Sequence, residues 1–207
     1  EFLAESEVSS RHFMDLGCRL IRGRIRLARG DRDVALQDAT TAVELAKQAR
    51  EPQALQPALA FQARAVLAAG SLDKASGLAS ELLAMLARQR AIVAEPNWSG
   101  ELAIVLQALG RGAELDDFAA QVTTPTPWLQ AATALARGEF RRAADLYAEI
   151  GSRPDEAFAR LHATKQLLAA GHRAEANAQL QAALGFYRQV KANTYLHEGE
   201  TLRAASA

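Results

Sequence analysis

The 207-residue chain carries 24 basic and 24 acidic side chains, so its formal net charge is zero and its pI lies near 7.2. This balance provides no overall field for nucleic acid or an anionic membrane surface, and no run approaches the roughly 18 apolar residues that a membrane-spanning helix needs. The chain is rich in Ala and Leu and poor in aromatic and β-branched residues, which favours helix throughout. We therefore expect an all-α, cytoplasmic protein that binds neither nucleic acid nor a membrane.

The predicted helices come in pairs along a single domain that covers residues 10–207. Residues 1–9 are expected to be a flexible start or a cloning remnant, because no Met precedes Glu1 and Phe2. Apolar residues at helical spacing predict five pairs. These pairs are 10–29 with a helix from about 31, 52–69 with 71–88, 101–109 with 113–121, 128–137 with 140–150, and 155–170 with 173–190. A final helix over 194–205 is expected to cap the open end of the stack.

Each pair turns at a glycine, and a small or apolar residue stands five positions later. The five places are Gly30 to Ala35, Gly70 to Ala75, Gly110 to Leu115, Gly138 to Ala143 and Gly171 to Ala176. The glycines are 40, 40, 28 and 33 residues apart, a spacing typical of stacked helix pairs. The shortest interval follows Gly110, within a region (92–127) where the pattern is degenerate, so we expect the stack to deviate there.

The stretch from Gly138 to Ile150 resembles the second half of a tetratricopeptide repeat (TPR). A glycine and an acidic residue form the turn, and Phe140, Ala143 and Tyr147 follow. The two aromatic rings would fill the space between paired helices, and the small residue would let the helices approach closely. Segments after two other repeat glycines carry a thinner version. The resemblance implies a right-handed α-solenoid of about five TPR-like helical hairpins with a C-terminal capping helix.

Two segments near the end of the chain, 185–188 and 195–200, are similar to the extreme C-termini of large bacterial signalling ATPases linked to cyclase or kinase domains. In such proteins a TPR-like array follows the catalytic and nucleotide-binding parts. The resemblance implies a non-catalytic protein-interaction or autoregulatory module, the C-terminal part of a larger bacterial signalling or regulatory protein. Its partner would be a protein or peptide, or another domain of the parent chain.

No group of residues in the sequence indicates catalysis, a cofactor or a metal ion. The phosphate-binding loop Gly-x-x-x-x-Gly-Lys-Ser/Thr is absent, and the four histidines are not spaced to share one helix face. The single cysteine, Cys18, has apolar neighbours and no adjacent histidine, so we expect a buried structural thiol. The chain is predicted not to be an enzyme and to have no catalytic, cofactor-binding or metal-binding residue.

Arginines follow one side of the first predicted helix at steps of three or four. They are Arg19, Arg22, Arg26 and Arg29. We expect this stripe to be solvated. The alternative is that it faces an upstream domain or an acidic partner.

Three other basic residues share one position of the repeat. Arg24, Arg64 and Lys165 each stand six residues before a repeat glycine. By resemblance to TPR arrays, this position of a first helix points into the concave groove, where the three could form a basic row for an acidic peptide or a carboxylate tail. The alternative, which the general behaviour of long basic side chains favours, is that each extends along its aliphatic stem to solvent.

A second functional class stays open, a small-molecule-sensing helical domain of a transcriptional regulator. Loop regions around Trp98 and Trp128 would form its pocket. A helical enzyme or a nucleic-acid binder fits least well, because the chain is neutral, has few lysines and lacks paired catalytic groups.

Overall fold

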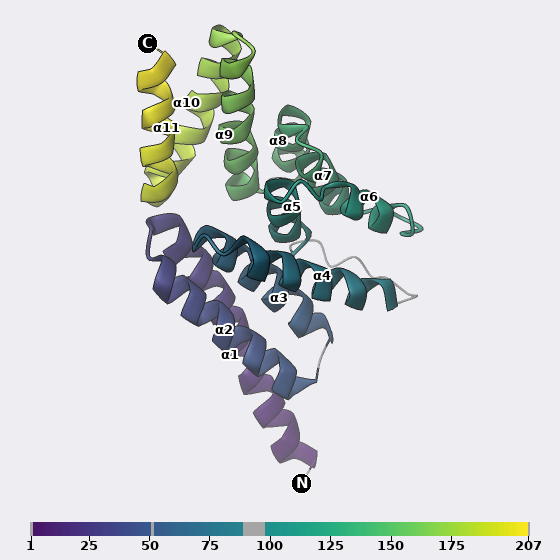
Figure 1. Cartoon of the computed structure of the whole chain (residues 1–207). Coiled ribbons are helices and arrows are strands. Elements are labelled where there is room, and N and C mark those ends of the chain that lie inside the picture. The colour runs from purple at the N-terminus through teal and green to yellow at the C-terminus, as the bar shows by residue number, and fades with distance from the viewer. Residues whose placement is uncertain (1, 51, 89–97, 207) are drawn as a thin grey trace.

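The computed structural model describes residues 2–50, 52–88 and 98–206, with side chains over 14–50, 53–88 and 98–204. Within these ranges the chain forms eleven helices and no strand (Figure 1). The helices are α1 (Phe2–Arg29), α2 (Arg32–Ala49), α3 (Pro52–Ala68), α4 (Leu72–Arg88), α5 (Ser99–Ala108), α6 (Ala113–Ala119), α7 (Pro127–Ala136), α8 (Phe140–Ile150), α9 (Arg153–Ala169), α10 (Arg173–Val190) and α11 (Asn193–Ser206). The predicted all-α class is confirmed.

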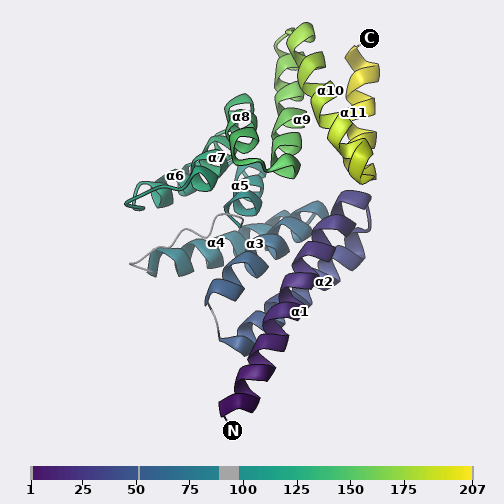
Figure 2. The same cartoon turned by 180° about the vertical axis from the view of Figure 1, so that it is seen from behind.

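Consecutive helices pack against one another, and the chain curves until its last helices meet its first. Helix α1 packs on α3, α3 on α5, and α5 on α7, so the first members of successive pairs form an inner row. Helix α11 lies against α1 and α9 (Figures 1 and 2). The hydroxyl of Thr194 donates a hydrogen bond to the Leu27 carbonyl at 3.3 Å, which joins the start of α11 to the end of α1.

The repeat glycines end their helices in the same way. Each of the five has a positive φ, between +70° and +103°, which a residue with a Cβ adopts at a cost. At Gly30 the glycine N–H donates to the Leu27 carbonyl at 3.2 Å, and the next N–H donates to the Arg26 carbonyl at 2.9 Å. The same pair of bonds closes the helix at the other four glycines. The sequence register therefore corresponds to a repeated backbone turn.

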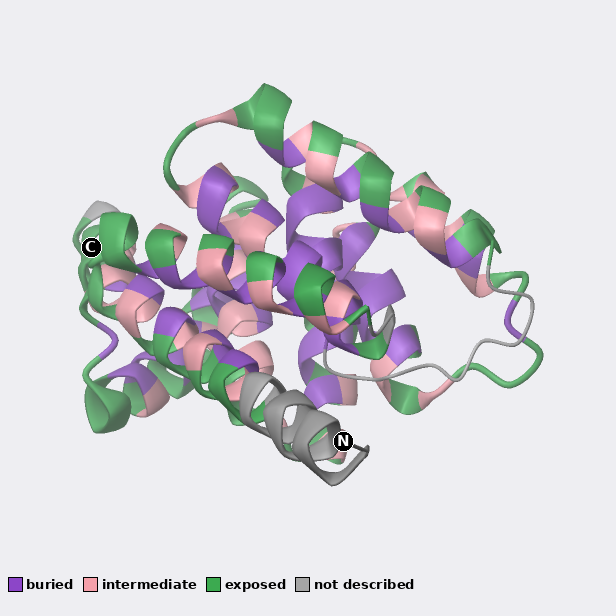
Figure 3. Ribbon diagram, turned by 90° about the horizontal axis from the view of Figure 1, so that it is seen from below, coloured by how far each residue is buried: buried purple, intermediate pink, exposed green. Residues whose placement is uncertain are grey.

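The residue five positions after each repeat glycine lies in the core. All five, including Leu115 and Ala143, are fully buried, and Phe140 and Tyr147 are buried as expected. Close approach also explains a glycine inside α1, because a Cβ on Gly23 would come within 2.6 Å of the Phe61 ring. Buried positions gather on the sides of the helices that face one another, and exposed positions follow the outer sides (Figure 3).

Some element bounds differ from expectation. Helix α1 begins at Phe2 instead of near residue 10, because residues 2–16 contain neither Gly nor Pro to interrupt a helical backbone. The third pair is short, with ten residues in α5 and seven in α6, and residues 99–106 of α5 are all buried. None of the helices in the described ranges has both the length and the apolar character to cross a bilayer.

Candidate functional site

A cavity of about 450 Å³ lies on the inner side of the curved array. Its lining comes from α1, α3, α5, α7 and the start of α9 on one side, and from the end of α10 and the start of α11 on the other. Apolar and aromatic side chains dominate the lining. Among them are Ile21, Ile25, Trp128, Phe158, Phe186, Tyr187 and Val190. The polar lining residues include Arg24, Arg64, Glu101, Ser152, Asp155 and Tyr195.

Glu101 is a buried carboxylate held between two arginines at the floor of this cavity. It stands in the first turn of α5 and is 6% exposed. Arg24 Nε donates to one carboxylate oxygen at 2.8 Å, and Arg64 Nη1 donates to the other at 2.7 Å. Burial by itself would raise the pKa of Glu101, but the charges and hydrogen bonds of Arg64 and Arg24 hold it below its ordinary value. Glu101 is therefore ionised, and it joins α1, α3 and α5.

Arg64 extends the same network to the end of the chain. Its Nη2 donates to the Tyr195 hydroxyl of α11 at 2.7 Å, and its guanidinium lies 5.4 Å from the centroid of the Phe158 ring. Burial opposes the charge of Arg64, but Glu101 more than compensates and raises the pKa of Arg64 above its ordinary value. The cavity floor is thus a polar network whose members come from α1, α3, α5 and α11.

Further polar groups near the floor are incompletely satisfied. Burial raises the pKa of Asp155, and the negative charge of Glu101 raises it further. The Ser152 hydroxyl, which donates a hydrogen bond to this carboxylate at 2.5 Å, acts in the opposite direction. The Tyr187 hydroxyl is buried without a hydrogen-bond partner in the described part of the chain, and the same holds for Tyr147. Burial raises the pKa of both tyrosines well above the ordinary value, so both are neutral donors.

The structure brings two of the three predicted groove residues together. Arg24 and Arg64 line the same cavity and share Glu101. Lys165 lies on α9 away from the cavity lining and forms an ion pair with Glu198 of α11. The three therefore do not form a continuous row of unpaired cations. Glu101 is the residue that sequence reasoning missed, and its arginine partners are 77 and 37 residues away along the chain.

The two tryptophans occupy different places. Trp128 lines the cavity, and its ring lies 6.3 Å from that of Tyr147. Trp98 is 2% exposed and packs on Phe118, with ring centroids 6.3 Å apart. The two tryptophans therefore do not share this cavity, in contrast to the pocket considered from the sequence.

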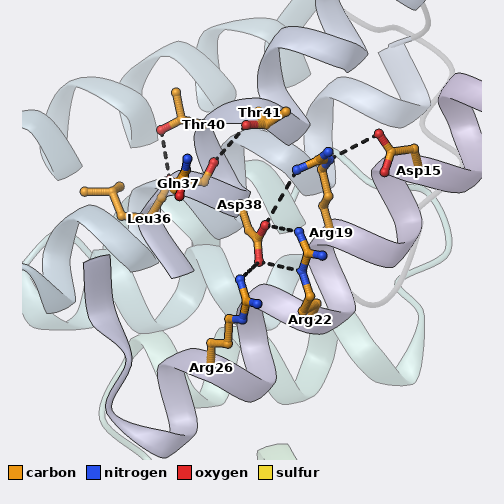
Figure 4. A network of polar contacts seen from close by, with 9 residues as sticks. All are labelled: Asp15, Arg19, Arg22, Arg26, Leu36, Gln37, Asp38, Thr40 and Thr41. Carbon is orange, nitrogen blue, oxygen red and sulfur yellow. Dashed lines mark hydrogen bonds and ion pairs between the residues drawn. The ribbon is translucent and has the colours of Figure 1, made fainter. Parts of the chain in front are cut away.

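A second buried carboxylate forms ion pairs with most of the arginines in the stripe on α1. Arg22 and Arg26 donate to Asp38 of α2 at 2.5 to 3.1 Å, and Arg19 lies 3.7 Å from it (Figure 4). The stripe is therefore only partly solvated: Arg22 is exposed, whereas Arg19 and Arg26 are partly buried beside the carboxylate of α2. The hydrogen bond from Arg22 is the main cause of a lowered pKa at Asp38. Arg29 remains exposed and has no ion pair with a described residue.

Two other sequence expectations concern reactive groups. Cys18 is exposed, so the expected buried thiol is wrong. Across the described residues, no three His, Cys, Asp or Glu side chains are grouped closely enough to hold a metal ion.

Comparisons with known proteins identify no relative: no family model, curated protein or solved structure matches the chain.

Proposed function

We propose that the chain is a non-catalytic protein-interaction or autoregulatory module, built as a TPR-like α-solenoid of about five hairpins with a capping helix. In this proposal it forms the C-terminal part of a larger bacterial signalling protein. The support is the repeated glycine turn, the buried small residue five positions later and the packing of consecutive helices. The resemblance of its last segments to signalling ATPases supports the parentage.

The observation that carries the interaction role is the apolar rim of the cavity. Ile21, Ile25 and Val190 are 60%, 47% and 42% exposed, and all three line this one cavity. Single exposed hydrophobic residues are ordinary, whereas several at one concave place characterise a binding surface. The proposed occupant is an apolar segment of a protein partner or of the parent chain, held in the groove between α1 and the end of α10.

The ion pairs with Glu101 limit what Arg24 and Arg64 contribute to the affinity for an acidic partner. Because Glu101 neutralises much of their charge, a strongly acidic peptide gains less there than from three free cations. We propose that these arginines shape the groove and orient the partner, and that apolar contacts at the rim provide most of the affinity. Lys165 remains a candidate contact only for a partner that reaches beyond the cavity.

Site-specific photocrosslinking tests this proposal. A photoreactive amino acid replaces Ile21 or Ile25 in the parent protein, in cells of its source, and matched controls replace the exposed Val34 or Leu72, which lie outside the cavity lining. The two rim positions are expected to label the same partner sequence, and the controls to leave it unlabelled. Absence of any crosslink from the rim, or equal labelling from the controls, would contradict an interaction role.

A second candidate, sensing of a small molecule, is favoured by the size of the cavity. About 450 Å³ falls within the range of ligand pockets, and Trp128 stands in the wall. With Trp98→Phe as background, quenching of the Trp128 emission by a metabolite would support this candidate. An unchanged spectrum across a metabolite library would count against it.

A further inference from the structure

Helix α1 carries two apolar seams; the described helices cover one along its length and the other only at its Ala28 end, which packs against α10 and α11. Leu16, Leu20, Gly23 and Leu27 form the inner seam, which is buried and faces α2 and α3. The outer seam consists of Met14, Cys18, Ile21, Ile25 and Ala28. Its members stand alternately four and three residues apart, which is the spacing that presents apolar side chains to a second helix.

The outer seam is open to solvent over most of its length. Met14 is 64% exposed, Ile21 and Ile25 are about half exposed or more, and Cys18 is exposed. The half of the seam from Ile21 to Ala28 lines the cavity, and the half towards Met14 continues beyond it along α1. At about 1.5 Å per residue the seam is about 21 Å long, which matches about four turns of a partner helix.

Arginines stand along both edges of this seam. Arg24 lies on one edge, and Arg22 and Arg29 lie on the other. The Nε of Arg24 bonds to Glu101, but its two terminal nitrogens have no acceptor among the described residues. Arg29 is exposed and has no ion pair within the same ranges. Over residues 14–29 of α1, four arginines pair with three carboxylates, Asp15, Asp38 and Glu101, and Arg29 stands in addition to them, so positive charge is in excess.

We propose that the outer seam of α1 docks an amphipathic helix of about four turns, whose apolar residues recur every three or four positions and whose flanks carry Asp or Glu. The proposal rests on the interaction role proposed above and specifies the partner. Apolar burial along the seam supplies the affinity, and acidic flanks find the open guanidinium groups of Arg24 and Arg29. A second copy of the chain fits less well, since two seams edged by arginine would repel each other.

Designed peptides test the proposal on the purified chain. One labelled peptide, about two heptads long to match the four turns of the seam, has Leu at the seam positions and Glu at the flanks; the matched peptide has Lys at the flanks. Fluorescence anisotropy is expected to show the Glu peptide binding at least about tenfold more tightly. Ile21→Ser with Ile25→Ser abolishes this binding, whereas the control pair Val34→Ser and Leu72→Ser leaves it unchanged. These four side chains are exposed, so circular dichroism should show the same helix content in both double variants.

Two further readouts locate the peptide. Arg29→Gln is expected to weaken binding about two- to fivefold and to reduce its dependence on salt. The alkylation rate of Cys18, the only thiol in the chain, is expected to fall in proportion to the fraction of chain bound.

Equal binding of both peptides, unprotected Cys18, or dimerisation through the seam in sedimentation measurements would overturn the inference. If these results occur while Ile21 and Ile25 still crosslink to a partner in cells, the partner is not such a helix, yet the interaction role stands. If the crosslinks fail as well, both proposals fall.

Discussion

The two buried carboxylates that arginines surround, Glu101 and Asp38, differ in how much of the molecule depends on them. Glu101 at the cavity floor has partners from α1 and α3, and the side chain of Arg64 is only 16% exposed. Asp38 is held by arginines of the adjacent α1, and the most exposed of them, Arg22, is half exposed. Glu101 therefore has distant and desolvated partners, whereas Asp38 has near and redundant ones. The ion pairs of Glu101 therefore hold together helices that line the cavity, whereas those of Asp38 hold α2 against α1.

Removal of the Glu101 carboxylate should cause the largest loss of stability. Glu101→Ala leaves Arg64 buried without its carboxylate, and breaking a buried ion pair costs about 3–5 kcal/mol. Urea unfolding followed by circular dichroism measures the loss. The matched variant Asp38→Ala should cost clearly less, because its arginines can turn to water. An equal cost for the two variants would contradict the contrast.

The stability of the chain should depend on pH through one partly buried histidine, His162. His162 lies between Phe140 and Phe158, and burial, helped by Lys165 and Arg64, lowers its pKa to about 4. The unfolded chain binds this proton at an ordinary pKa of about 6.5, so stability should fall as pH drops from about 6.5 to 4, by up to about 3 kcal/mol.

The sign follows from the lowered pKa, since between these values only the unfolded state is protonated. Unfolding free energies measured at several pH values should show this slope in the wild-type chain and lose most of it in His162→Gln. A slope that persists unchanged in the variant would assign the titration elsewhere.

Removal of the Tyr195 hydroxyl should have a smaller effect. Tyr195→Phe deletes the acceptor of the Arg64 Nη2 bond, and a hydrogen bond to a charged group contributes about 1.5 kcal/mol. Because this bond joins α3 to α11, faster amide exchange in α11 should accompany the loss when mass spectrometry follows deuterium uptake. Faster exchange spread evenly over all helices would argue against a local tie.

The smallest effect is expected from a single arginine of the stripe. Arg26→Gln leaves Asp38 with Arg22 and Arg19, so the free energy of unfolding should fall by less than about 1 kcal/mol. Thermal unfolding measures it against the wild-type chain. A loss as large as that of Asp38→Ala would show that the partners of Asp38 are not redundant.

The sequence predicts local features better than long-range ionic pairs. Gly30 and its counterparts mark real turns, because positive φ and a following small residue are local requirements. The register also puts Arg24 and Arg64 at equivalent positions, and both line the cavity. Glu101 gave no such signal, since an acidic residue in a first helical turn has an ordinary local explanation.

The sequence around Asp38, in contrast, does indicate an ion pair. It stands on the apolar face of α2, between Ala35, Ala39 and Ala42, all of which are buried. A carboxylate at such a position needs a cationic partner, and the stripe on the neighbouring helix supplies three. Cys18 differs from expectation for a related reason: its apolar neighbours belong to the outer seam of α1, and apolar character alone does not distinguish a core face from an exposed face.

Crosslinking from opposite sides of the cavity mouth tests the central claim most directly. Ile25 of α1 and Val190 at the end of α10 line the same cavity but are 165 positions apart in the chain. Photoreactive residues at these two positions in the parent protein should attach to one and the same segment of one partner. Attachment to unrelated segments, or attachment of that same segment to Leu72 as well, would contradict a partner-binding groove at this place.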